Sequence, residues 1–350
     1  MSIFSAPKFL SMPAVGLDIS TDSVRFVELE PFAGHFRVAH HGEAALLPGV
    51  VQGGVVHDPE ALSKVVGQLA KEHHLSMANI ALPEEQAFLA HMEFPRVPLR
   101  DVGTAVAVHL EEYVPVPPEE AIYDYVITES EHDDTTSVIA SVLPRKTVEQ
   151  YLEIFHDTGI TPKSFEFQSH AMARALFSKK DRGAYMGVDI GKDITNVFIV
   201  RDGIVNFSAI LDIGGDTLTH AIERKLGIPF VEAETLKARH GLVGGAEGGA
   251  LRDAMLPVLE DLRTRILRHF AFWQSRNATI AGIERVLLTG GGANLKGMTE
   301  YLGQGVRVAM LVANPWVNVC DFSTYIPDIP MHAAHGYTAA IGLALRNEPL

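Results

Sequence analysis

The sequence is poor in cysteine: Cys320 is the only one among 350 residues. An intramolecular disulfide is therefore excluded, and a metal site built on cysteine is not expected. Proteins of a reducing compartment carry few disulfides, so this content agrees with a cytoplasmic protein. We expect a cytoplasmic location.

A hydrophobic run long enough to cross a membrane is also missing. About 20 apolar residues are needed, and the longest contender, Val306–Val319, is interrupted by Asn314 and Pro315. The N-terminal segment does not resemble a signal peptide, because Pro7 and Pro13 break its apolar stretches. We expect no direct membrane insertion; if the protein works at a membrane, a partner must hold it there.

Positive charge is scarce. The chain has 29 Lys and Arg against 43 Asp and Glu, a net charge of −14. Such a surface repels phosphate backbones and anionic lipid, so nucleic acid is not an expected partner. The length and the 47% of hydrophobic residues are those of a folded protein with two domains.

The most informative feature is an internal repeat. Residues Val15–Leu29, VGLDISTDSVRFVEL, align without gaps with Met186–Val200, MGVDIGKDITNVFIV. Both segments have the pattern of a strand, a short polar turn and a second strand. Each copy is followed by another strand-like run (His35–His41 and Ile204–Ile213) and a helical pattern (Pro59–Lys71 and Asp216–Leu226). The repeat predicts a duplicated α/β fold with two related halves.

Additional segments separate and follow the two copies. Between them the pattern predicts strand, helix, two strands, helix and strand: Gln86–Phe94, Leu99–Tyr113, Ala121–Thr128, Thr136–Leu143, Arg145–Thr158 and Pro162–Phe167. We interpret this as a βαββαβ subdomain inserted at residues 86–163. The first half would then comprise 1–85 and 164–184. The second would comprise 185–215 and 282–350, around a helical insertion at 216–281.

Each repeat places an aspartate where an apolar strand meets a turn of small polar residues. Turn amides and the hydroxyls of Ser20, Thr21 and Thr195 suit the oxygens of a polyphosphate. Asp18 and Asp189 cannot contact phosphate without repulsion, but they could orient a hydrated Mg²⁺. A single DIS or DIG turn is more often only a strand end. Two copies in register favour the functional interpretation.

A third element is the segment Val286–Met298, VLLTGGGANLKGM. An apolar strand leads into Gly290–Gly292, and we expect a helix to begin near Asn294. Glycine backbone can approach a flat base and ribose closely, and a helix N-terminus offers free N–H groups. A tight connection without function is the alternative. The spacing matches neither a P-loop nor a dinucleotide-binding fingerprint.

These three elements, in this order, resemble the actin-like ATPase superfamily, which has a duplicated, ribonuclease H-like fold of two domains. The resemblance narrows to the PilM family of type IV pilus assembly proteins, relatives of the division protein FtsA. It covers about residues 14 to 346 and is carried by Asn79–Pro95, Glu111–Tyr125, Leu211–Ile222, Glu232–Lys237 and His335–Arg346.

The resemblance implies ATP or ADP and Mg²⁺ as cofactors. Asp18 and Asp189 would be the metal residues. The phosphates would contact the two turns through Ser20, Thr21, Arg25, Gly191, Lys192 and Thr195. The ribose and base would contact Glu234, Lys237, Gly290, Gly291, Gly292 and Asn294.

Hydrolysis in such proteins requires a residue that positions water at the junction between the halves. Glu166 and Gln168 lie in the matching stretch, FEFQSH, and the sequence does not choose between them. Ser20 replaces a glycine that is common in the family. Its side chain either closes positive φ values to the turn or adds a hydroxyl. We expect ATP to bind and at most a slow ATPase activity.

The implied function is that of a cytoplasmic adaptor of the pilus machine. It would bind the N-terminal tail of a PilN-like inner-membrane protein, with other pilus components as further partners. An FtsA-like division filament and a small-molecule kinase are the alternatives. No sugar site is recognisable, and the chain ends at ALRNEPL without an amphipathic helix. Both features favour the adaptor.

Overall fold

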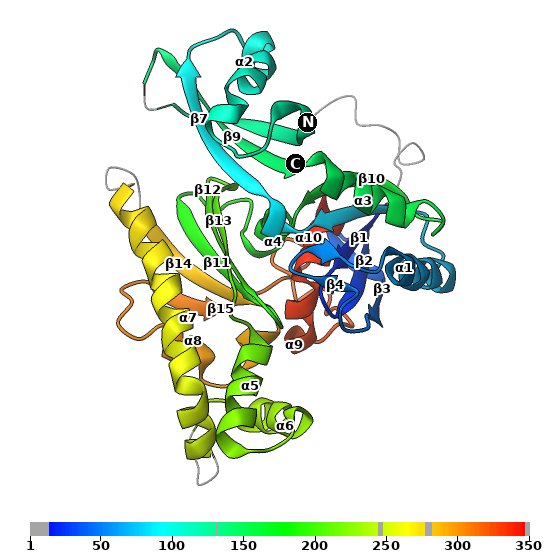
Figure 1. Ribbon diagram of the computed structural model, residues 1–350, viewed down its shortest axis with the longest axis vertical. Helices are drawn as coiled ribbons and strands as arrows, with labels where there is room; N and C mark the ends of the chain where they lie inside the picture. Colours follow the sequence, from blue (N-terminus) through cyan, green and yellow to red (C-terminus); the bar gives the residue numbers. More distant parts are fainter. Residues whose placement is uncertain (1–13, 131, 244–247, 277–281, 347–350) are drawn as a thin grey trace.

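Two five-stranded sheets, one in each half of the sequence, form the centre of the molecule (Figure 1). The computed structural model describes residues 14–130, 132–243, 248–276 and 282–346. The interpretations of the first 13 and the last four residues lie outside this part. The first sheet contains β1 (Val15–Ile19), β2 (Ser23–Phe32), β3 (His35–Ala45), β6 (Met77–Leu82) and β10 (Thr161–Phe167). The second contains β11 (Ala184–Ile190), β12 (Thr195–Arg201), β13 (Ile204–Leu211), β14 (Ile283–Thr289) and β15 (Ala309–Val312).

The two sheets have the same topology. Their orders are β3-β2-β1-β6-β10 and β13-β12-β11-β14-β15. In each, an antiparallel meander of three strands continues into two parallel strands. Asp18 lies opposite Arg25 in the first sheet, and Asp189 lies opposite Asn196 at the same register in the second. The predicted duplication of an α/β unit is therefore confirmed.

One face of the first sheet is covered by α1 (Pro59–His73) and α3 (Arg145–Phe155). Asp58 caps the N-terminus of α1, because its carboxylate accepts a hydrogen bond of 3.0 Å from the Ala61 amide. Pro59 occupies the first helical position, where a proline is well tolerated. A short hairpin, β4 (Val51–Gln52) and β5 (Val55–Val56), precedes this helix. The apolar residues of β1 and β2 that alternate toward these helices form the core of the half.

The opposite face of the first sheet carries α4 (Gln168–Leu176) and α10 (Thr338–Leu345), which lie between the two sheets (Figure 1). A Cβ at Gly16 or Gly342 would overlap backbone oxygens of the neighbouring element, so glycine permits this close packing. Trp316, Val319 and several buried residues between Ile329 and Leu345 share a core with β2 and β3. The described C-terminal segment after β15 therefore packs on the first half.

The inserted subdomain is smaller than the sequence predicts. Its sheet has the order β7-β9-β8, formed by β7 (Phe88–Pro95), β8 (Ala121–Thr128) and β9 (Thr135–Pro144) with α2 (Val102–His109) packed on it. The predicted element order βαββαβ is present, but β10 pairs with β6 and α3 packs on α1. The subdomain thus ends near 144 instead of 163, because element order does not decide which sheet a strand joins.

Several short 3₁₀ helices interrupt the predicted pattern. They are η2 (Glu84–Gln86), η3 (Leu99–Asp101), η4 (Leu110–Glu112), η5 (Pro118–Glu120), η6 (Gly291–Asn294) and η7 (His335–Tyr337). The helix expected at Leu99–Tyr113 is therefore α2 flanked by η3 and η4.

The segment that follows β13 in the second half is helical in its described residues. It contains α5 (Gly215–Leu226), α6 (Phe230–His240) and the long α7 (Gly248–Arg276), and two short helices follow: α8 (Met298–Leu302) and α9 (Met331–Ala334). Leu251, Met255, Leu259, Leu262 and Ile266 form a buried stripe on α7. Among the described helices, none combines the length and the apolarity that a membrane crossing requires.

Candidate functional site

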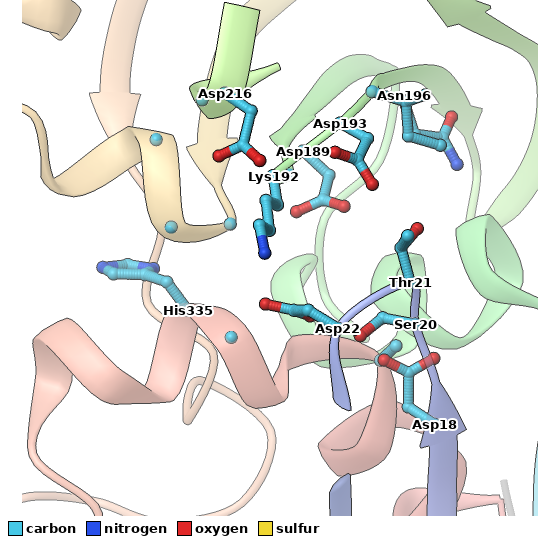
Figure 2. Close-up of a pocket in the computed structure, with 18 of the residues that line it drawn as sticks. Asp18, Ser20, Thr21, Asp22, Asp189, Lys192, Asp193, Asn196, Asp216 and His335 are labelled. Carbon is cyan, nitrogen blue, oxygen red and sulfur yellow. Dashed lines mark hydrogen bonds between the residues drawn. The ribbon is translucent and has the colours of Figure 1, made fainter. Parts of the chain in front are cut away.

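A cavity of about 630 Å³ lies between the two halves. Both repeat turns, the glycine turn after β14 and helix α6 contribute to its wall, and Figure 2 shows how the polar side chains face it. Fourteen of the sixteen predicted site residues line it: Asp18, Ser20, Thr21, Arg25, Gln168, Asp189, Gly191, Lys192, Glu234, Lys237, Gly290, Gly291, Gly292 and Asn294. Glu166 and Thr195 lie outside the lining.

Asp18 is the next-to-last residue of β1 and is only 5% exposed. Its Oδ1 accepts a hydrogen bond of 2.8 Å from Nε2 of Gln168, at the start of α4. Burial raises the pKa of Asp18, and the nearby Asp22 adds to the rise, although Gln168 and Arg25 oppose it. The amide of Gln168 therefore holds the carboxylate in place, but the positive charge of Arg25 does not fully offset the cost of burying its negative charge.

Asp189 occupies the equivalent position at the end of β11. Burial raises its pKa to about 7, and the negative charge of Asp18 contributes to the rise. The two aspartates thus interact across the cavity that both line. In the described residues, no group of three or more His, Cys, Asp or Glu side chains is arranged to hold a metal. A cation here would take its remaining ligands from water or from another ligand.

The first turn is closed by bonds of Ser20. Its amide donates to the carbonyl of Ser23 at 2.9 Å, and its hydroxyl donates to the same carbonyl and to Asp22, each at 3.0 Å. The amide of Gly191 makes the equivalent bond to Ile194 at 2.9 Å. Neither Ser20 nor Gly191 has a positive φ. A side chain at Ser20 therefore causes no backbone strain, and its hydroxyl stabilises the turn.

Thr195 does not face the cavity. Its side chain is fully buried, and its hydroxyl donates to the carbonyl of Ile213 at 2.6 Å. The hydroxyl predicted to contact phosphate is thus used inside the second half, where it ties β12 to the segment that leads into α5. In the first turn, by contrast, Thr21 lines the cavity.

Two basic side chains enter this acidic region. Lys192 extends into the space near Asp189 and Asp22 in Figure 2. Arg25 lies against Glu43, 2.7 Å away, and above the ring of Tyr337 at 5.9 Å. These contacts orient the guanidinium from outside the cavity, so Arg25 has defined partners before any ligand is considered.

The glycine turn differs from the sequence interpretation. Residues Gly291–Asn294 form η6, and the next α-helix begins at Met298, because Gly297 has a φ of +84°. No helix begins at Asn294. Its side-chain amide instead donates a hydrogen bond of 2.8 Å to the carbonyl of His332. Gly290 has a φ of +78°, and a Cβ there would lie 2.5 Å from Oδ1 of Asp189. Glycine at 290 thus lets the turn approach Asp189.

Glu234 and Lys237 form a bonded pair on α6. The Nζ of Lys237 donates to the carbonyl of Gly215 at 2.8 Å and to the hydroxyl of Thr219 at 2.7 Å, and it lies 2.7 Å from Glu234. Burial would raise the pKa of Glu234, but the hydrogen bonds from Lys237 and Thr219 lower it below its usual value. The pair joins α6 to the start of α5 at the edge of the cavity.

Glu166 forms ion pairs with two arginines. It is 8% exposed, and its carboxylate lies 2.6 Å from both Arg174 and Arg346. Burial opposes ionisation, yet the two arginines lower the pKa of Glu166. This network joins β10, α4 and the end of α10. Of the two candidates for positioning water, the structure places Gln168 in the cavity and Glu166 outside it.

The cavity contains polar residues that the sequence analysis missed. Asp22, Asp193 and Asn196 line it, together with Asp216 and His335. The repeat itself carried the signal for the first three: Asp22 aligns with Asp193, and Asn196 aligns with Arg25. The segment His335–Arg346 contributed to the family resemblance, but no pattern in it placed His335 at the site, because His335 reaches the cavity only through tertiary packing.

The sequence matches the family described as type IV pilus assembly protein PilM over residues 16–348. The chain belongs to this family. Two relatives of the PilM-family chain are cell division proteins FtsA. That of Streptococcus pneumoniae is 27% identical over 190 residues, which cover 49% of this chain and 40% of the relative. That of Agrobacterium fabrum is 28% identical over 187 residues, which cover 43% and 42%. The chain therefore spans less than half the length of these curated relatives.

Solved structures support the same fold. The PilM-PilN type IV pilus biogenesis complex matches with a TM-score of 0.81 and 24% identity, over 97% of this chain and 100% of that one. The ethanolamine utilization protein EutJ from Carboxydothermus hydrogenoformans gives 0.56 and 18%, over 97% and 93%. MreB5 of Spiroplasma citri bound to ADP gives 0.55 and 14%, over 96% and 99%. The PilM-family chain has the predicted actin-like fold.

Proposed function

We propose that this chain is a pilus assembly protein that binds ATP or ADP with Mg²⁺ between its two halves. The observation that carries the proposal is the cavity into which two equivalent aspartate turns face at the same sheet register. If the two turns served only to connect strands, their carboxylates would not need to line the same cavity. A single ligand that both turns bind explains this arrangement.

The residues in the cavity fit a metal–nucleotide ligand. Burial raises the pKa of both aspartates, and the charge of Asp18 further raises the pKa of Asp189, so a divalent cation would relieve an unfavourable concentration of negative charge. Lys192, Thr21 and the turn amides would bind the phosphates. Gly290–Gly292 would face the nucleoside, because a turn without Cβ atoms admits a close approach. When bound, Mg²⁺ would neutralise phosphate charge.

Gln168 is the residue best placed to orient water for a slow hydrolysis. Its amide lines the cavity and is already bonded to Asp18. We propose that Gln168→Ala retains nucleotide binding but reduces ATP turnover. Glu166 would not orient the water, because its carboxylate is paired with two arginines.

The nucleotide proposal is tested by titrating the purified chain with ATP and ADP, with and without magnesium. Asp18→Asn and Asp189→Asn should each raise the Kd for the magnesium–nucleotide by about tenfold or more, because each removes a charged interaction with the cation. Asp157→Asn is the matched control, since that side chain is 91% exposed. A wild-type protein that binds neither nucleotide contradicts the proposal.

We further propose that this chain binds the cytoplasmic N-terminal tail of a PilN-like inner-membrane protein, which thereby recruits it to the membrane. Support comes from membership of the PilM family and from a solved relative that is described as a complex with PilN. An extended tail in a groove beside the inserted subdomain would be an ordinary recognition mode. Calorimetry with the tail peptide and a scrambled control would test this. Equal binding of both peptides contradicts it.

A further inference from the structure

The C-terminal segment forms a wall of the cavity that contains a buried histidine. His335, in η7, lines the cavity and is 3% exposed. Its Nδ1 is buried and has no hydrogen-bond partner in the protein. A buried polar atom that lacks a partner is destabilising, so an orphaned nitrogen at a ligand cavity indicates a contact that the ligand completes.

The backbone at His335 is tied to the segment around the glycine turn. The hydroxyl of Thr338 donates to the carbonyl of His335 at 3.0 Å and lies 2.7 Å from the hydroxyl of Thr289, the residue before the glycine turn. One turn earlier, Asn294 donates to the carbonyl of His332. These bonds tie the elements on either side of η7 to β14 and η6, and η7 itself packs on η6, so His335 and the glycine turn belong to the same wall of the cavity.

The position separates His335 from the phosphate end of the cavity. In Figure 2 its ring lies away from Asp18, Ser20 and Thr21, with Lys192 between them. Burial lowers the pKa of His335, and the nearby His332 adds to this effect. A neutral imidazole has one donor and one acceptor nitrogen, which suits a hydroxyl or a ring nitrogen better than a phosphate charge.

We propose that His335 recognises the nucleoside part of the bound nucleotide through a hydrogen bond to the ribose or the base. This inference rests on the proposed nucleotide function and adds a residue that sets selectivity. It explains why the C-terminal segment is tied to the glycine turn, since the two segments together would surround the nucleoside.

The test compares ATP, 2′-deoxyATP and inorganic tripolyphosphate, each with magnesium, on the full chain. His335→Phe keeps a ring but removes both nitrogens, and it should raise the Kd for ATP about tenfold while tripolyphosphate binding stays within about twofold. His335→Gln, which keeps a hydrogen-bonding group, should recover part of the loss. The control is His332→Phe, because that side chain is exposed one turn away. If the ribose hydroxyl is the partner, wild type should prefer ATP to 2′-deoxyATP, and His335→Phe should not.

The outcomes separate this inference from the proposed function. Unchanged ATP affinity in His335→Phe, or an equal loss for tripolyphosphate, would mean that a bound water or a structural role satisfies the imidazole, and it overturns the inference while nucleotide binding stands. Failure of wild type to bind any of the three ligands overturns the proposed function itself. Should His335→Phe melt far below wild type, His335→Gln decides the question with the same ligands.

Discussion

Asp189 illustrates how folding creates an unfavourable charge at a single residue. Its carboxyl has an ordinary pKa of 3.8 and a folded value of about 7. The folded chain therefore holds its proton more tightly than the unfolded chain. This group destabilises the nucleotide-free fold increasingly as the pH rises from about 4 to about 7, and by a constant amount above that. A cation that binds the carboxylate would remove the cost.

We predict that Asp189→Asn stabilises the nucleotide-free protein at neutral pH. The free energy of unfolding should rise by an amount on the order of 1–4 kcal/mol at pH 8, and by clearly less at pH 5, since one pKa unit corresponds to about 1.4 kcal/mol. Denaturant titrations at the two pH values measure this. Asp157→Asn, at a side chain that is 91% exposed, is the control. A gain for Asp189→Asn that is equal at both pH values would contradict the assignment of the raised pKa.

At the scale of elements, the contact of α10 with α4 and β1 determines how the two halves meet. Asn79 contributes a hydrogen bond of 3.0 Å to the carbonyl of Leu343, and Arg174 donates to the carbonyl of Gly342 at 2.8 Å. At Gly342 the α4 backbone is so near that a Cβ would overlap the carbonyl of Ala171. A glycine in this helix is thus required by packing, despite its lower helix propensity.

We predict that Gly342→Ala destabilises the fold by about 2 kcal/mol or more, because α10 must move off α4 to admit the methyl group. Gly67→Ala is the matched control in α1, where a Cβ would lie at an ordinary contact distance of 3.6 Å from Thr158. That change should stabilise the protein by about 0.5–1 kcal/mol through helix propensity. Thermal and denaturant unfolding of both variants provide the measurement. Two variants of equal stability would refute this account of the glycine.

At the scale of the whole molecule, Glu84 joins the two halves through one buried carboxylate. It lies in η2, between β6 and the inserted subdomain, and is 6% exposed. The amide and hydroxyl of Ser169 donate to it from the first half. Asn196 on β12 and Ser208 on β13 donate from the second half, the latter at 2.8 Å. Asn196 also lines the cavity, so this carboxylate connects the proposed nucleotide site to the base of the subdomain.

We predict that Glu84→Gln weakens the coupling between the halves. The amide can satisfy fewer of the four donors, so stability should fall by about 1–3 kcal/mol, and calorimetric unfolding should separate into two transitions. In the wild type, nucleotide and tail peptide should tighten each other by equal factors, and the variant should reduce that factor. Glu72→Gln is the control, because Glu72 is an exposed side chain on α1. A single transition and an unchanged coupling factor in Glu84→Gln would contradict this role.

The sequence by itself determined the duplication, because strand alternation and an aspartate at the strand end are local features that the two copies share. From this repeat follow the twin sheets, the paired turns and the positions of Asp18 and Asp189. Only the tertiary structure decided that β10 joins the first sheet, that Glu166 pairs with Arg346, and that His335 reaches the cavity. These facts depend on contacts between residues far apart in the chain, and no local pattern encodes which partner a strand edge or a buried charge will meet.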